Sequence, residues 1–235
     1  MAAVLNEAEN IRPVCAELAE AARALPPCEI IFVDDGSTDG TVDALVAART
    51  DGILPDLRII SHDRRLGKSA AVRTGVEAAR GQWIATLDGD GQDDPMEIVR
   101  MFDLAQKAQG PAPLVVGVRL RRQDTLSRRL ATRFANGLRR RLLRDGCPDT
   151  GAPLKLFRRA DFLRLPQFEG VHRFLPALFG HYGTPLLCQP VRHRNRLHGS
   201  SKYTNFNRAL VGFRDLLGVI WLINRTRLPR RVTER

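Results

Sequence analysis

Cysteine is scarce in this chain, and its few cysteines follow none of the spacings that hold metal ions. The four are Cys15, Cys28, Cys147 and Cys188, and no Cys-x-x-Cys pair or histidine cluster accompanies them. This pattern indicates neither a zinc site nor a disulfide framework. Reduced thiols, as in a cytoplasmic protein, are the default expectation.

Long hydrophobic runs are missing as well. The longest one, residues 216–223, has eight residues, whereas a helix that spans a bilayer needs about 20. No secretory signal peptide is recognisable at the start of the chain. We therefore expect a protein that does not cross a membrane by itself.

Aromatic residues are sparse, at 6% of 235 residues, which leaves few platforms for stacking nucleic-acid bases. The net charge of +11 would otherwise suit nucleic acid, but it is unevenly spread. Residues 1–118 carry a net charge of −8, whereas residues 119–144 and 192–235 carry +9 each. An acidic front half repels phosphates unless a metal ion intervenes, so we expect no nucleic-acid partner. The basic blocks are expected to meet an anionic membrane surface or phosphorylated substrates.

An acidic turn after an apolar run is the strongest functional signal. The run 84–87 ends at Asp88-Gly89-Asp90, with Gln92 two residues further on. Residues i and i+2 of an extended segment point to the same face, so Asp88 and Asp90 can converge on one point. Two like charges held that close are costly unless a cation lies between them, and oxygen ligands suit Mg²⁺ or Mn²⁺. The alternative is a strand-end turn that serves only backbone geometry.

A second acidic turn, Asp34-Asp35-Gly36-Ser37, follows the apolar run 30–33. Ser37 or Thr38 is expected to cap the helix that comes next. In an open α/β sheet, ligands bind outside the carboxyl ends of the strands. Both acidic turns are therefore predicted to lie on one functional edge of the sheet.

Strand and helix patterns alternate along the front half, which favours an α/β fold with a mostly parallel sheet and helices on both faces. Strands are predicted at 30–33, 57–61, 83–87 and 114–118, and helices at 7–24, 38–48, 67–80 and 95–108. Only residues 1–5 precede Asn6-Glu7. The opening strand is therefore either truncated or a short stub.

Two basic amphipathic helices are predicted further along, at about 124–144 and 205–224. Each has an apolar stripe at helical spacing beside arginines, and the second ends near Trp221. Such helices are typical of a membrane interface. The alternative is a surface helix that packs its stripe on the domain core.

Asn6-Glu7, the turn at Asp34 and the turn at Asp88 together resemble the family 2 glycosyltransferases with the GT-A fold. Further segments make the resemblance closest to the branch of dolichyl-phosphate mannose synthase and bacterial polyprenyl-phosphate hexosyltransferases. These segments are Val116–Arg119, Arg128–Asn136, Asp149–Gly151 and Arg196–Tyr203. The chain departs from the family before Asn6, where the usual proline is absent, and at 152–155, which lack the aromatic residues common in that branch.

The resemblance implies a GT-A domain over residues 1–203, with an acceptor-side helix at about 124–144, and a basic membrane-interface tail at 204–235. It implies a Mg²⁺ or Mn²⁺ site at Asp88, Asp90 and Gln92. The implied nucleotide-binding residues are Glu7, Asp34, Asp35, Lys68 and Asp88. The implied acceptor and phosphate contacts are Arg119, Arg128, Thr132, Arg196 and Lys202, and those closest to the chemistry are Asp90, Arg119 and Arg128.

The implied function is an inverting transfer of a hexose from a GDP- or UDP-sugar to a polyprenyl or dolichyl phosphate. It would take place at the cytoplasmic face of the cell membrane, where the protein would be peripheral and could have a membrane-protein partner. A hydroxyl acceptor needs a carboxylate base, and the comparable stretch, residues 170–178, has none. The processive Gln-x-x-Arg-Trp signature is also missing.

Other readings stay open at this point. The acceptor could be a lipid or glycan hydroxyl, the protein could be a basic nucleic-acid-binding protein, or it could be an inactive scaffold. His172 and Arg173 are either acceptor contacts or a pair in a surface loop. The other histidines have no ligand spacing and are expected to be structural; they are His62, His181, His193 and His198.

Overall fold

The computed structural model describes residues 1–119, 137, 139–143, 145–195 and 205–228, and for 205–210 it describes the backbone alone. Four residues of the predicted site lie outside the described residues. These are Arg128, Thr132, Arg196 and Lys202.

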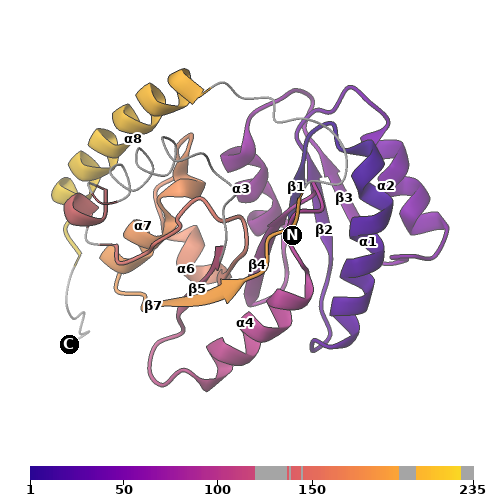
Figure 1. Ribbon diagram of the computed structural model, residues 1–235, viewed down its shortest axis with the longest axis horizontal. Coiled ribbons are helices and arrows are strands. Elements are labelled where there is room, and N and C mark those ends of the chain that lie inside the picture. Colours follow the sequence, from indigo (N-terminus) through magenta and orange to yellow (C-terminus); the bar gives the residue numbers. More distant parts are fainter. Residues whose placement is uncertain (120–136, 138, 144, 196–204, 229–235) are drawn as a thin grey trace, which may run out of the picture.

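One seven-stranded sheet forms the centre of the molecule, in the strand order β3-β2-β1-β4-β6-β5-β7 (Figure 1). The strands are β1 (Ala2–Val4), β2 (Ile31–Asp34), β3 (Arg58–Ser61), β4 (Trp83–Asp88), β5 (Leu114–Arg119), β6 (Lys155–Arg158) and β7 (Leu186–Val191). β6 runs antiparallel to its neighbours β4 and β5, and the other pairs are parallel. The predicted α/β class with a mostly parallel sheet is confirmed.

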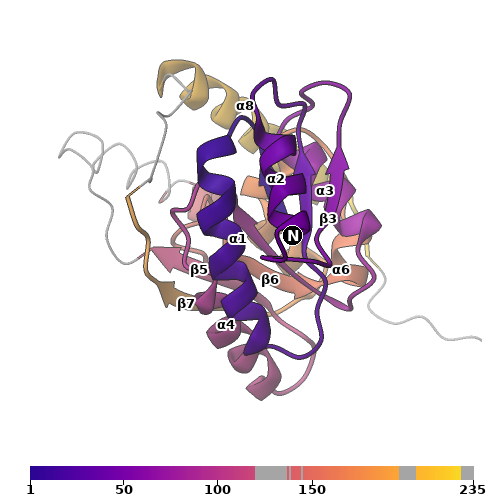
Figure 2. The ribbon, with the colours of Figure 1, turned by 90° about the vertical axis from the view of Figure 1, so that its right-hand side faces the viewer.

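Helices cover both faces of this sheet. They are α1 (Ala8–Arg23), α2 (Thr41–Thr50), α3 (Lys68–Ala78), α4 (Met96–Lys107), α6 (Arg159–Leu163), α7 (Leu175–His181) and α8 (Asn205–Arg225), with a 3-10 turn η1 (Val171–Arg173). α1 and α2 lie side by side and share one face with α4 (Figure 2). α3, α6, α7 and α8 cover the other face.

Side-chain alternation along the strands supplies these two cores. In β2, Phe32 points into the core under α1 and α2, while Ile31 and Val33 point into the core under α3. All three are at most 1% exposed. Each face of the sheet thus buries apolar side chains against a helical layer, the usual arrangement of an α/β domain.

The predicted strands and helices of the first 119 residues are confirmed to within a few residues. The opening strand is a three-residue stub, yet it pairs with both β2 and β4 and lies inside the sheet. The expected cap of α2 is wrong, because the helix begins at Thr41. Ser37 instead accepts the backbone N–H of Asn6 at 2.8 Å, and Thr38 donates its own N–H to the Asn6 side chain.

The predicted acidic residues of the site lie at or just after the carboxyl ends of β1, β2 and β4, as parallel pairing requires. Between the two acidic residues of the β4 turn, Gly89 lies directly against β1. A Cβ atom at Gly89 would be 2.2 Å from Cγ1 of Val4, which is 3% exposed. The Asp-Gly-Asp turn can follow its path only because its middle residue has no side chain.

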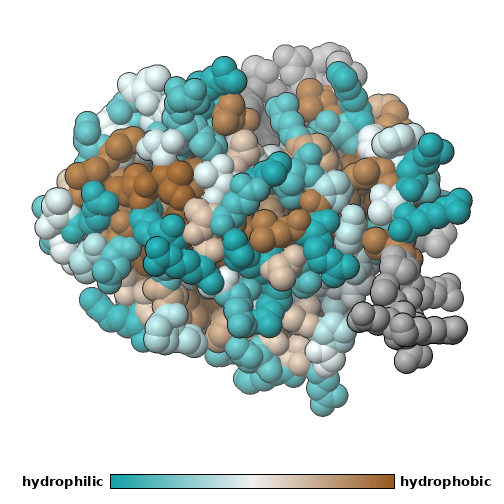
Figure 3. Space-filling view, turned by 180° about the vertical axis from the view of Figure 1, so that it is seen from behind, coloured by the Kyte–Doolittle hydropathy of each residue, from teal (hydrophilic) through white to brown (hydrophobic). Residues whose placement is uncertain are grey.

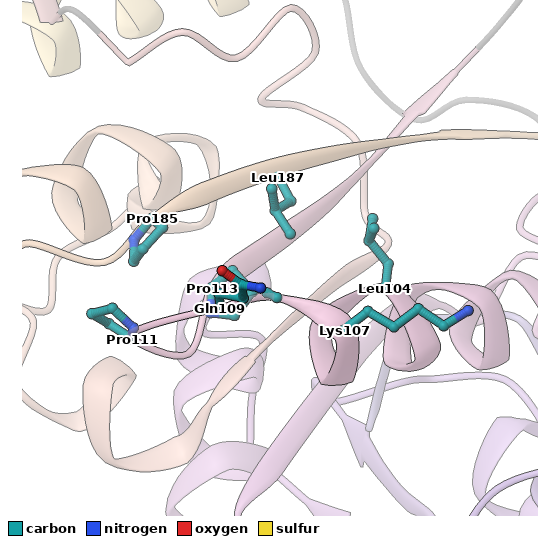
Figure 4. Close-up of a pocket in the computed structure, with 8 residues that line it drawn as sticks. Leu104, Lys107, Gln109, Pro111, Pro113, Pro185 and Leu187 are labelled. Atoms are coloured by element: carbon teal, nitrogen blue, oxygen red, sulfur yellow. The ribbon is translucent and has the colours of Figure 1, made fainter.

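Two cavities lie away from this edge. One, of about 310 Å³, is lined by Pro113 and Pro185, which precede β5 and β7, and by Leu104 and Lys107 of α4 (Figure 4). It therefore lies at the opposite edge of the sheet. The other, of about 650 Å³, lies among α7, α8 and Leu142, Leu143 and Asp145. Neither is lined by a described residue of the acidic turns.

Gly89→Ala is expected to destabilise the fold by about 1–3 kcal/mol, because the new methyl group must displace Val4 or the turn. Urea unfolding measures the change. Gly180→Ala is the matched control: Gly180 is exposed in α7 and a Cβ there meets nothing within 4 Å. Equal stability of the two variants would contradict the tight approach of β1 and the acidic turn.

Candidate functional site

Asp35 holds the turn that leads into α3. Its carboxylate accepts the backbone N–H groups of Leu66 at 2.9 Å and Gly67 at 2.8 Å, and it contacts Nδ1 of His62 at 2.9 Å. His62 also contacts the hydroxyl of Thr74 in α3 at 3.0 Å, which supports its expected structural role. Asp35 is 4% exposed, so its main contacts are made within the protein, and they fix where α3 begins.

The first acidic turn and the β1–α1 loop are bonded into one unit. Asp34 accepts the N–H of Ser37 at 3.2 Å, and Glu7 donates its backbone N–H to Thr41 at 2.9 Å. The side chain of Glu7 accepts a hydrogen bond from Asn10 at 2.6 Å. Gly36 has φ of +75°, and a Cβ there would be 2.6 Å from the backbone of Arg64. The residues predicted to surround a nucleoside are thus brought together by backbone and side-chain contacts.

Lys68, the first residue of α3, reaches across to the second acidic turn. Its Nζ lies 2.5 Å from Oδ1 of Asp88, and both side chains are about one-third exposed. The positively charged ammonium group of Lys68 therefore neutralises the carboxylate of Asp88. The predicted nucleotide-binding residues of β2, α3 and β4 therefore share one edge.

Gln92 is oriented by a strand end from the far part of the chain. Its Nε2 donates to the carbonyl of Arg194 at 3.2 Å, and the N–H of Arg194 donates to the carbonyl of Gln92 at 2.9 Å. Because the amide nitrogen is used in this way, Oε1 remains as the free oxygen of the side chain. Asp90, 8% exposed, accepts the N–H of Gln92 at 3.2 Å. The turn thus presents oxygen atoms held by backbone contacts.

Arg194 and His193 also fix the turn from outside. The Arg194 guanidinium pairs with Asp94 at 3.2 Å and with Glu17 of α1 at 2.6 Å. Nδ1 of His193 lies 3.6 Å from Asp93, which is 3% exposed. Burial raises the pKa of Asp93, and nearby negative charges add to the rise. None of these contacts was expected from the sequence.

The acidic turn fits a divalent cation by the chemistry of its donors. Asp88, Asp90 and the free Oε1 of Gln92 are the hard oxygen ligands that Mg²⁺ and Mn²⁺ take. Asp88 and Asp90 also lie close enough to Asp93 for their charges to add to the pKa rise that burial causes, so the carboxylates of the turn are near neighbours. Within the described part of the chain, no three His, Cys, Asp or Glu side chains are already grouped as a metal site.

Arg119, at the end of β5, lies at the same edge and is held by a two-point ion pair. Its Nε and Nη2 donate to Asp149 at 2.6 and 2.8 Å. Burial alone would lower the pKa of Arg119, but the hydrogen bonds and charge of Asp149 raise it. The arginine is therefore a fixed, permanently charged donor.

The arginines of the basic block 119–144 do not all face outward. Arg139 is 7% exposed and bonds to Thr150 and to the carbonyl of Cys147. It anchors the turn that carries Asp149. The arginines beside the apolar stripe of this predicted helix are therefore not all available to a membrane surface or a substrate.

Lys155 is a charged residue of the site that was missed from the sequence. It opens β6, opposite Thr86 of β4, and is only 4% exposed. Its ammonium group donates to the carbonyl of Ala152. Burial, and then the charge of Lys68, lower the pKa of Lys155 to about 8. A lone lysine in an apolar strand gives no motif, so only the strand pairing reveals where it lies.

The sequence allows two roles for His172, and the structure places it against the first turn of α3. Its Nδ1 is 2.8 Å from the hydroxyl of Ser69, which also accepts the N–H of Gly170 at 2.9 Å. Burial, and then the charges of Lys68 and Lys155, hold the pKa of His172 well below its usual value, so the imidazole is neutral.

Comparison with known proteins agrees with this geometry. Residues 2–165 match the profile described as glycosyl transferase family 2. The chain belongs to glycosyl transferase family 2. Its relatives include a dodecaprenyl-phosphate galacturonate synthase of Rhizobium johnstonii, 34% identical over 94% of this chain. An undecaprenyl-phosphate 4-deoxy-4-formamido-L-arabinose transferase of Pectobacterium carotovorum is 35% identical over 86% of the chain. The alignments span 65% and 61% of the length of these two relatives.

Solved structures confirm the GT-A fold predicted for this family 2 chain. Glucosyl-3-phosphoglycerate synthase of Mycobacterium tuberculosis with phosphoglyceric acid aligns with a TM-score of 0.71 at 19% identity, covering 94% of this chain and 77% of its own. The same protein with Mn²⁺ and uridine-diphosphate-glucose aligns with a TM-score of 0.67, also at 19% identity, covering 94% and 76%.

Lys155→Met is expected to stabilise the fold at pH 7, because a buried charge is replaced by an apolar side chain of similar size. The folded protein has a pKa of about 8 at this group against 10.5 when it is free. Between these two pH values the unfolded chain binds the proton more strongly than the folded protein does, so the free energy of unfolding of the wild type rises with pH. The stability advantage of Lys155→Met over the wild type therefore narrows across this window.

Urea unfolding at several pH values measures this narrowing. Lys107→Met, at an exposed lysine of α4, is the control and should show no such pH dependence. A Lys155→Met protein that is less stable than wild type at every pH would contradict the assignment of a buried, uncompensated ammonium group.

Proposed function

We propose that this family 2 chain is an inverting glycosyltransferase that moves a hexose from a nucleotide-diphosphate sugar to the phosphate of a polyprenyl or dolichyl lipid. The observation that carries the proposal is the meeting, at one sheet edge, of an oxygen-donor turn at Asp88–Gln92 and a fixed guanidinium at Arg119. The first suits the diphosphate of a donor through a metal ion, and the second suits an anionic acceptor. The named relatives act on dodecaprenyl and undecaprenyl phosphates.

The donor would lie along the carboxyl ends of β1, β2 and β4. Glu7, Asp34 and Asp35 would border the nucleoside, and the N-terminus of α3 with Lys68 would face its phosphates. Asp88, Asp90 and Gln92 would hold Mg²⁺ or Mn²⁺, which when bound would neutralise charge on the departing diphosphate. The donor base in this proposal is guanine or uracil.

A phosphate acceptor fits the Arg119 side of this edge better than a hydroxyl acceptor does. A phosphate monoester is already anionic and needs orientation more than deprotonation, whereas a hydroxyl needs a carboxylate base. His172 and Arg173, the polar pair in residues 170–178, already have partners within the protein. The neutral His172 contacts Ser69, and Arg173 pairs with Asp215 of α8 at 2.8 Å. Arg119 is the described acceptor contact, with Arg128, Thr132, Arg196 and Lys202 proposed beside it from the resemblance.

Membrane contact is proposed for α8. Leu216 and Val219 pack into the core, at 7% and 1% exposure, while Phe213, Leu217 and Trp221 form a stripe that is 51–64% exposed. Arg214 and Arg225 beside the stripe are exposed as well. This is the arrangement of a helix that lies in a lipid interface near anionic headgroups. Elsewhere, on the face in Figure 3, hydrophobic residues form separate patches divided by hydrophilic ones.

The proposed location is the cytoplasmic membrane surface, with residues 1–203 as the catalytic domain and 204–235 as the interfacial tail. Among the described helices, none has the length and apolarity needed to pass through a bilayer. A partner membrane protein remains part of the proposal.

Asp90→Asn is expected to lower sugar transfer to undecaprenyl phosphate at least about 100-fold, because a metal ligand and its charge are lost. Metal-dependent binding of the nucleotide, measured by calorimetry, should be lost in parallel, with the circular dichroism spectrum unchanged. Asp103→Asn, at an exposed position of α4, makes the same charge change and should be active. Full activity of Asp90→Asn would remove the proposed metal site.

Replacing Leu217 and Trp221 together by serine is expected to release the protein from vesicles of phosphatidylglycerol and phosphatidylcholine in a sedimentation assay. The stripe supplies apolar area that a lipid surface would bury. Val46→Ser, at an exposed residue of α2 on the other side of the sheet, should bind as wild type does. Unchanged sedimentation of the double variant would mean that α8 makes no lipid contact.

A further inference from the structure

Lys155 lies at the same edge as the acidic turn, although it belongs to another strand. β6 is antiparallel to β4, and Lys155 pairs with Thr86, two residues before Asp88. Paired residues of neighbouring strands point to the same face, and so do residues two apart in one strand. Lys155 and Asp88 therefore share a face. The ammonium group bonds to the carbonyl of Ala152, which precedes β6, and so it bends toward the carboxyl end of β4.

The ammonium group is buried without a carboxylate partner. Of its three donors, one reaches Ala152, and none of the described carboxylates lies within 4 Å of Nζ. Asp88 is already paired with Lys68, and Asp149 with Arg119, both at contact distance. A buried charge that is neither paired nor fully hydrogen-bonded is costly. Two N–H donors are thus held in a low-dielectric site with nothing described to receive them.

The surrounding charges place this group between the two halves of the proposed site. The charges of Lys68, Asp88 and Asp149 act on Lys155. Its strand, β6, lies between β4, which ends at Asp88 of the Lys68–Asp88 pair, and β5, which ends at Arg119 of the Arg119–Asp149 pair. From η1, the neutral His172 faces the same two lysines and brings no negative charge.

We infer that Lys155 forms an anion-binding subsite at the reaction centre, where its ammonium group donates to a negatively charged oxygen of a substrate. The inference rests on the proposed function. The oxygen belongs either to the acceptor phosphate or to a carboxylate on the transferred sugar, since both would lie between the two ion pairs. Either anion would supply the partner that the buried ammonium group lacks, and would be recognised more strongly there than in water.

The test compares Lys155→Met and Lys155→Arg with the wild type, with Mg²⁺ present. Calorimetry gives the affinities for UDP, UDP-galactose and UDP-galacturonate, and undecaprenyl phosphate is titrated in detergent micelles. The methionine variant is expected to lose about tenfold or more in affinity for the ligand that carries the anion, and the arginine variant to keep most of it. Weaker binding of UDP-galacturonate but not of UDP-galactose identifies a sugar carboxylate. Weaker binding of undecaprenyl phosphate identifies the acceptor.

The pH dependence separates ligand binding from a structural role. Because the pKa of Lys155 is about 8, the affected affinity of the wild type should fall as pH rises through that value. In Lys155→Arg it should persist, since a guanidinium stays charged. If Lys155 had only a structural role, replacing it by arginine would not change how ligand affinity falls as pH rises above about 8.

The inference fails if Lys155→Met binds all four ligands as the wild type does, or if it loses affinity equally for UDP itself, which would place the effect at the diphosphate. If the wild type binds neither undecaprenyl phosphate nor any of the three uridine ligands or their GDP counterparts, the proposed function fails and the subsite fails with it. If the wild type binds these ligands and Lys155→Met binds them with the same affinity, the subsite is ruled out while the proposed function stands.

Discussion

Repulsion among carboxylates gathered at one sheet edge is the constraint on which the rest of the structure depends. Parallel pairing of β1, β2 and β4 brings the acidic turns after β2 and β4 to the same edge. The carboxylates of these turns are neutralised or hydrogen-bonded to different extents. Asp35 is satisfied by two backbone N–H groups and His62, and Asp88 by Lys68. Burial raises the pKa of Asp93, and the charges of Asp88 and Asp90 add to the rise; a divalent cation at the turn would offset these negative charges.

The inserted antiparallel strand gives the edge its second half. β6 lies between β4 and β5, so the turn that precedes it carries Asp149 to Arg119 and brings Lys155 beside Asp88. The acidic half suits a metal-bound diphosphate, and the cationic half suits an anion that approaches from the lipid. The same strand pairing therefore builds two regions of opposite charge within reach of one another, as the proposed transfer of a sugar from a diphosphate to a phosphate requires.

Local patterns predict the parts of this site that depend on one segment. The apolar run that ends at Asp88 is enough to place Asp88 and the turn residue Asp90 at the carboxyl end of a strand, and the alternation of elements predicts the α/β sheet. Contacts between distant segments leave no such trace. The orientation of Gln92 depends on the backbone of Arg194, and the burial of Arg139 depends on the turn at Thr150. The cap of α2 is wrong for the same reason, because Ser37 is used by Asn6 of another loop.

The most direct measurement of the central claim is transfer of a radiolabelled sugar from a panel of GDP- and UDP-sugars to undecaprenyl phosphate, with Mg²⁺ or Mn²⁺ and with a chelator. The account predicts lipid-phosphate-linked sugar from at least one donor, formed only when the divalent cation is present. Product that forms equally well under the chelator, or transfer only to a sugar or lipid hydroxyl, would contradict it.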